Sequence, residues 1–136
     1  MKFYIASSLK NMRNVRQVAE SLKACGFQHT YDWTTHSKVD SIGKLREIGQ
    51  EEVSGVMNAD VVIIMFPAGK GCHVELGIAL GAGKKIYLHS TTNELNELEN
   101  TCTFYHVDAV EQRMGSIDDL INSVCLEYLY KYNERI

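Results

Sequence analysis

Residues 61–81 read VVIIMFPAGKGCHVELGIALG, and this stretch decides the fold. Its six leading apolar residues predict a buried strand, and a loop with glycines at 69 and 71 then enters a helix with Glu75 near its first turn. In a parallel α/β sheet such a loop lies where ligands bind, and glycines let the backbone approach a sugar or phosphate. The stretch therefore predicts a ligand site, although a solvated Glu75 that stabilises the helix dipole is the competing interpretation.

The rest of the chain alternates predicted strands and helices. Strands are expected at Phe3–Ser7, Phe27–Trp33, Asp60–Phe66, Lys85–His89 and Thr103–Val107. Helical spacing runs from Asn11 to a stop at Gly26, from Leu45 to Met57 with a candidate break at Gly49, from Cys72 to Ala82, and onward from Ser116. This alternation predicts an α/β, flavodoxin-like, doubly wound sheet of five parallel strands in the order 2-1-3-4-5. In that order the loop at 7–11 neighbours the loop at 67–71.

Composition limits the classes of function. The 136 residues are expected to form a single domain, 1–136, and a net charge of −3 gives no footprint for a nucleic acid polymer or an acidic membrane. No apolar stretch approaches the ~18–20 residues of a membrane helix, and the N-terminus MKFYIASS is not a secretory signal. Four scattered cysteines without a leader predict a cytoplasmic protein with free thiols.

Cysteine and histidine spacing predicts neither a metal site nor another cofactor. Cys25 and Cys125 fall on apolar helix faces and are expected in the core, whereas Cys72 lies where a helix N-terminus would lower its pKa. His73 stands two residues before Glu75 and therefore faces another side of the helix. The other histidines are expected at strand ends (His89, His106) or in solvent (His29, His36).

A glycosidase site is the chemistry that these residues favour. Cleavage of an N-glycosidic bond uses a carboxylate at C1′ and a second group that assists departure of the base. Glu75 suits the nucleophile, and Glu51, Glu52 and Asp60 are candidates for the second carboxyl. Because Asp60 opens a strand at the opposite edge, capping or ion pairing is its expected role.

Further side chains near the predicted crevice have two interpretations each. Tyr4 is either a core aromatic or a phenol that orients Glu75 and tunes its pKa. Trp33 either stacks on a base or packs in the core. Polar residues after the first strand either hold a sugar or 5′-phosphate or form an ordinary loop, and these are Ser7, Ser8 and Lys10.

Three segments of the chain resemble the nucleoside 2-deoxyribosyltransferase-like family, including its nucleoside 5′-monophosphate N-glycosidase branch. They are KFYIAS at 2–7, EVSGVMNADVVII at 52–64 and GKGCHVELGIALGAGKKI at 69–86. The resemblance implies that Glu75 is the nucleophile, that Tyr4 orients it, and that Glu52 stands at the family's second acid. It also implies hydrolysis or base exchange on a nucleoside or nucleotide, with Phe66, Gly69 and Gly71 beside the substrate.

Two departures from the family pattern bear on the activity. Glu52 replaces an aspartate, and Gly69 stands where transferases tend to carry an acidic base-binding residue. The second departure favours a hydrolase, and Ser8 and Lys10 match positions that the monophosphate hydrolases use against the 5′-phosphate. A catalytically silent nucleotide-binding or sensor domain is a further alternative.

The glycine loop also resembles a second family, and the first resemblance bears on the assembly of the protein. PAGKGCHVE at 67–75 is similar to the P-G-G-x-G-T-x-x-E motif of phosphoribohydrolases that release cytokinin bases, which break the same bond. Sites of the deoxyribosyltransferase-like family are completed by a neighbouring subunit, so a homodimer or larger assembly is implied. The C-terminal tyrosines, Tyr128, Tyr130 and Tyr132, are compatible with such an interface.

Overall fold

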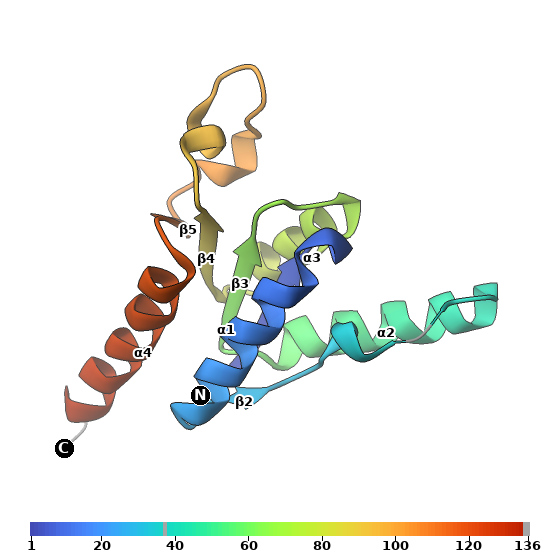
Figure 1. Cartoon of the computed structure of the whole chain (residues 1–136), viewed down its shortest axis with the longest axis horizontal. Helices are drawn as coiled ribbons and strands as arrows, with labels where there is room; N and C mark the ends of the chain where they lie inside the picture. The colour runs from blue at the N-terminus through green and yellow to red at the C-terminus, as the bar shows by residue number, and fades with distance from the viewer. Residues whose placement is uncertain (37, 135–136) are drawn as a thin grey trace.

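A five-stranded parallel sheet forms the centre of the computed structural model, which describes residues 1–36 and 38–134, with 131–134 described by their backbone only. The strands are β1 (Lys2–Ser7), β2 (Gln28–His29), β3 (Val61–Met65), β4 (Lys85–Ser90) and β5 (Val110–Met114). The α-helices are α1 (Met12–Ala24), α2 (Ile42–Asn58), α3 (Lys70–Gly81) and α4 (Ile117–Glu134). The strand order is β2-β1-β3-β4-β5, so the predicted fold class and order are confirmed (Figure 1).

Helices cover both faces of the sheet because successive side chains of a buried strand point to opposite sides. Ile5 and Ile63 belong to the core that α1 and α4 cover. Tyr4 and Val62 belong to the core under α2 and α3. The outer half of α2 projects from the rest of the molecule, on the opposite side from α4 (Figure 1).

Local signals set most helix boundaries where the sequence predicts them. Gly26, with φ of 94°, follows the end of α1. Ser116 Oγ accepts from Asp119 N at 3.0 Å while Ser116 N donates to Asp119 Oδ2 at 3.2 Å, which caps α4. Gly49 lies inside a continuous α2, so the candidate break there is wrong.

The second strand is shorter than predicted. It ends at His29, and Trp33 begins a 3-10 helix, Trp33–Thr35. Asp32 causes this change because its carboxylate accepts from the amide of Thr34 at 2.9 Å and from its hydroxyl at 2.6 Å.

The predicted fifth strand, Thr103–Val107, is wrong. Residues 103–105 form a 3-10 turn that buries Tyr105, and β5 follows at Val110–Met114 with the sequence VEQRM. An edge strand with one buried apolar residue has no alternating hydrophobic pattern. Its charges are paired instead, since Glu111 contacts Lys85 at 3.1 Å and Arg113 at 2.9 Å.

Two further sequence expectations concern the ends of elements. Asp60 accepts from Lys2 N at 2.8 Å, which confirms a capping role at the amino edge of the sheet. Cys25 is exposed and Cys125 is only partly buried, so their expected core placement is wrong; Cys25 follows the last residue of α1. Of the helices in the described residues, none has the length and apolar character to cross a membrane.

Candidate active site at the carboxyl edge of the sheet

The loops after β1 and β3 are in direct contact, as the strand order predicts. Ser8 N donates to Pro67 O at 2.9 Å, and Ser7 Oγ donates to Met65 O at 2.8 Å. Asn11 Nδ2 donates to Phe66 O at 3.2 Å. Through these bonds, one of which uses the Ser7 hydroxyl, the two loops form a continuous rim at the switch point of the sheet.

A cavity of about 510 Å³ opens between this rim and α2. It brings together most of the predicted site residues, which are Ser7, Ser8, Lys10, Trp33, Glu52, Gly69, Gly71 and Glu75. Phe66 is not among the lining residues; its ring packs edge-on against Tyr105 with the centroids 5.4 Å apart. A direct substrate contact by Phe66 is therefore not supported.

Glu75 lies in the second turn of α3 and is only 7% exposed, although it lines the cavity. Burial raises its pKa to about 7, the negative charge of Glu52 adds to the rise, and the Tyr4 hydroxyl opposes it as a donor. This environment differs from that of a solvated first-turn glutamate. A buried carboxyl group with a pKa near neutral pH, lining a cavity, is typical of catalytic sites.

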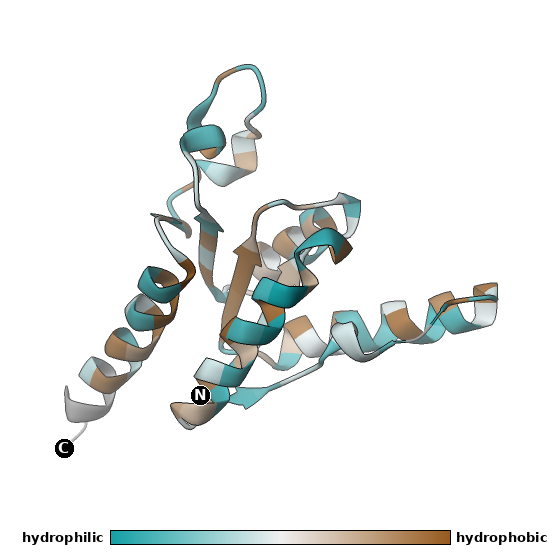
Figure 2. Cartoon of the chain, in the orientation of Figure 1, coloured by the Kyte–Doolittle hydropathy of each residue, from teal (hydrophilic) through white to brown (hydrophobic). Residues whose placement is uncertain are grey.

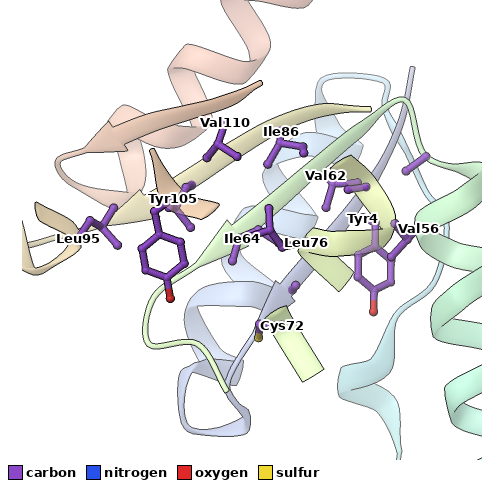
Figure 3. Close-up of a cluster of buried hydrophobic side chains, with 14 residues drawn as sticks. Tyr4, Val56, Val62, Ile64, Cys72, Leu76, Ile86, Leu95, Tyr105 and Val110 are labelled. Atoms are coloured by element: carbon purple, nitrogen blue, oxygen red, sulfur yellow. The ribbon is translucent and has the colours of Figure 1, made fainter. Parts of the chain in front are cut away.

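Tyr4 is fully buried in the core under α2 and α3 (Figure 3), and it lies near Glu75. Burial and the Glu75 charge raise its pKa, so the phenol keeps its proton. Tyr4 Oη and Glu75 Oε2 are both buried without a well-aligned hydrogen-bond partner among the described residues. The pair is close enough for each to shift the pKa of the other. Tyr4 is thus a core aromatic that lies near the carboxylate, and its role in orienting Glu75 stays a prediction.

Glu52 projects from α2 into the same cavity and is half-buried. Burial raises its pKa, and the nearby His36 opposes that rise. His36 also lines the cavity, and its Nε2 contacts the Tyr31 hydroxyl. The expectation of a solvent-exposed His36 is wrong. It was missed because it lies in a polar, irregular segment with no periodic pattern.

Apolar side chains form much of the remaining wall. They come from the loop after β1, from the segment before α2 and from α2 itself, and are Leu9, Val39, Leu45 and Ile48. In the sequence they read as ordinary surface or core positions. Trp33 faces the cavity too, and its Nε1 donates to Ile5 O at 2.6 Å, which fixes the indole against β1.

Cys72 and His73 precede Glu75 on α3 and have different environments. Cys72 is buried in the first turn of α3, and burial with the nearby Glu75 charge raises its pKa to about 11, so the expected helix-terminal lowering is wrong. His73 turns away from Glu75, as predicted, and its Nε2 lies 2.6 Å from the Tyr105 hydroxyl. Within the described residues no cluster of three or more His, Cys, Asp or Glu side chains is arranged to hold a metal.

Solved structures share this fold. The CMP N-glycosidase BcmB of Clostridium botulinum superposes with a TM-score of 0.66 at 17% identity, over 93% of this chain and 99% of that chain. A 2-deoxyribosyltransferase from Bacillus psychrosaccharolyticus gives a TM-score of 0.68 at 19% identity, over 90% of this chain and 91% of that chain. Among curated proteins, none matches significantly.

The sequence itself matches the family model described as nucleoside 2-deoxyribosyltransferase over residues 3–119. That span includes β2 to β5, all of β1 except Lys2, and every candidate site residue. The chain therefore belongs to the nucleoside 2-deoxyribosyltransferase family of enzymes.

Proposed function

We propose that this protein hydrolyses the N-glycosidic bond of a nucleoside 5′-monophosphate or nucleoside, with Glu75 as nucleophile. The observation that carries the proposal is the buried Glu75 carboxylate, which opens onto the cavity with a pKa of about 7. The structural relatives named above act on CMP and on 2-deoxyribosyl groups, and both chemistries concern the bond between a sugar and a base.

The proposed reaction has two steps. The Glu75 carboxylate attacks C1′ while the bond from C1′ to the base nitrogen breaks, and the base leaves with the electron pair and gains a proton. Water then attacks C1′, which releases Glu75 and the free sugar. Glu52 is the proposed acid and base, because its half-buried carboxyl has a raised pKa and lines the same cavity. Tyr4 holds the Glu75 carboxylate in the orientation for attack.

Ser8 and Lys10 are the proposed phosphate contacts. Both line the cavity at the end of β1, and Lys10 is exposed and free to reach an anion. An ammonium group and a hydroxyl at one rim suit a 5′-phosphate. Trp33 and the apolar wall of Val39, Leu45 and Ile48 offer a surface for the base.

Transfer of the sugar to a second base is the alternative reaction. Gly69 at the rim presents no side chain, and among the described residues no atom would lie within 4 Å of a Cβ at this position. An incoming base therefore lacks the acidic group that transferases tend to supply at this position. We propose hydrolysis as the main outcome for this reason.

A panel of ribo- and deoxyribonucleoside 5′-monophosphates, with and without an added free base, tests the proposal. Free base and sugar phosphate in the absence of acceptor support hydrolysis. A new nucleotide that forms only with acceptor supports transfer. Saturable nucleotide binding without any base release supports the sensor alternative and contradicts the proposal.

We also propose that residues 1–136 form one domain and that it works as a homodimer or larger assembly. α2 and α3 expose apolar side chains, with Val53 47% and Val74 63% exposed. Figure 2 shows apolar residues along the outer turns of α2, where Ile42 and Leu45 are exposed. A second hollow of about 630 Å³ between α2 and α3 includes Glu52 and Glu75, so a second copy seated there would close the site.

The C-terminal tyrosines give this assembly less support than the sequence suggests. Tyr128 packs edge-on against Phe27 of its own chain, with centroids 4.7 Å apart. Tyr130 is exposed, and the side chain of Tyr132 lies outside the described part of the structure.

Sedimentation at micromolar concentration tests the assembly. Val53→Lys places a charge in the α2–α3 hollow and is expected to produce monomers, whereas Leu126→Lys, a charge on exposed α4, leaves the assembly unchanged. A wild-type monomer with full turnover would contradict the proposal.

A further inference from the structure

Two cysteines from distant parts of the sequence face each other where the end of α1 meets α4. Cys25 follows the last residue of α1, and Cys125 lies in α4, 100 positions later. Cys125 Sγ lies 2.7 Å from Cys25 Sγ, and both residues are free thiols. This separation is only a fraction of an ångström longer than the ~2.05 Å of a disulfide bond.

Packing on both sides holds the two thiols at this separation. Leu22 in the last turns of α1 and Val124 in α4 are both buried in the core beneath them. The ring of Tyr128, one turn beyond Cys125, contacts Phe27 just after Cys25. These contacts hold the two segments together, and the two sulfur atoms already lie 2.7 Å apart.

We propose that Cys25 and Cys125 form a reversible disulfide that ties the C-terminal helix to the end of α1 under oxidising conditions. The bond is a modification site separate from the proposed chemistry. Because α1 runs back across the sheet, its end and Cys25 lie at the amino edge, whereas Glu75 and the cavity lie at the carboxyl edge.

The chemistry requires an oxidant, and a hydroperoxide balances the reaction. Cys25 is exposed, so its thiolate meets the peroxide first, breaks the O–O bond and becomes a sulfenic acid. The thiolate of Cys125 then attacks that sulfur and displaces hydroxide, which leaves as water. In total two thiols and one hydrogen peroxide give one disulfide and two waters.

Burial and the neighbouring Cys25 raise the pKa of Cys125 to about 12. Near neutral pH only a small fraction of Cys125 is a thiolate. The rate at which Cys125 attacks the Cys25 sulfenic acid is therefore expected to increase with pH. The contact distance compensates, because the attacking sulfur is already in place.

A disulfide here closes a loop of about 100 residues, for which the chain-entropy account predicts a large stabilisation. Formation of the disulfide is expected to raise Tm by ~5 °C or more and to slow hydrogen exchange in α4. Reduction by a dithiol reverses both changes.

The experiment treats the purified full chain with hydrogen peroxide and counts thiols, maps peptides without reduction, and measures Tm. We expect the loss of two thiols per chain and a peptide pair that joins residues 25 and 125. Cys25→Ser and Cys125→Ser are expected to lose both the cross-link and the rise in Tm, and Cys102→Ser is the matched control that keeps them.

Several outcomes would overturn the proposal. They are a cross-link between two chains through Cys25, oxygen added to Cys25 without loss of the second thiol, or a disulfide that leaves Tm and the exchange of α4 unchanged. Since Cys25 is exposed and Cys125 only partly buried, the serine variants are expected to fold, and their circular dichroism spectra check this.

Discussion

Gly55 of α2 lies directly against the ring of Tyr4. A Cβ at residue 55 would stand 3.0 Å from Cδ2 and 3.0 Å from Cε2 of Tyr4, and 2.9 Å from Cβ of Tyr31. Glycine is thus the residue that lets α2 pack directly against the ring of Tyr4. In Figure 3, Tyr4 of β1 lies beside Val56, which follows Gly55 in α2. The Tyr4 hydroxyl oxygen is directed away from the apolar cluster.

Gly55→Ala is therefore expected to lower both stability and turnover. Overpacking of a rigid core costs about 1–3 kcal/mol, and here the strain falls on Tyr4. Gly43→Ala is the control in the same helix, since within the described part of the chain its Cβ would meet only Ser41 Oγ, at 4.0 Å. Urea unfolding and base release measure the two effects. An alanine at 55 that behaves like the alanine at 43 would contradict this packing argument.

The core strands and the rim of the site could be predicted from the sequence because their signals are local. The apolar run of β3 and the glycines after it place Glu75, and the parallel strand order then brings the 7–11 loop beside it. Gly83, with φ of 69°, follows the end of α3 as the sequence indicates.

The remaining features depend on long-range contacts and gave no local pattern. β5 pairs with β4, Glu111 of β5 forms an ion pair with Lys85, and the sequence VEQRM has no alternation. His36 lines the cavity and contacts Tyr31. The close packing of Gly55 against Tyr4 joins residues 51 positions apart. The pairing of Cys25 with Cys125 is likewise a product of the tertiary structure.

Glu75→Gln is expected to stabilise the protein at pH 8 more than at pH 4. The pKa of Glu75 is raised from 4.5 to about 7 by folding, so the unfolded state loses its proton first as pH increases. The charged carboxylate then costs stability, about 3 kcal/mol once the pH exceeds 7. Denaturant unfolding of both proteins at the two pH values measures the difference. An equal effect at pH 4 and pH 8 would show that Glu75 is not desolvated as described.

Tyr4→Phe is expected to reduce kcat roughly tenfold or more, because a donor to a charged group is lost. Wild-type kcat/KM should increase with pH up to about 7, as Glu75 ionises. The tyrosine donor lowers that pKa, so the variant's profile should move to higher pH. The melting temperature should change little, because the buried ring and its packing remain and only the hydroxyl is removed. An unchanged profile with a lower Tm would leave Tyr4 a core residue only.

Lys10→Ala is expected to raise KM for a nucleoside 5′-monophosphate roughly tenfold or more, through loss of a charge-assisted contact. The same change should leave KM for the nucleoside unaffected. Lys23→Ala, an exposed lysine of α1 paired with Glu20, is the control. Steady-state kinetics on both substrates distinguish the effects. Equal losses on nucleoside and nucleotide would rule out a phosphate contact by Lys10.

The central claim is that the Glu75 carboxylate attacks C1′, and the rate of base release by Glu75→Gln tests it most directly. The measurement compares wild type and variant at saturating substrate, with folding checked by circular dichroism and nucleotide binding by calorimetry. We predict that the variant folds and binds nucleotide but releases base at least ~10³-fold more slowly. Base release by folded Glu75→Gln at the wild-type rate would contradict the account.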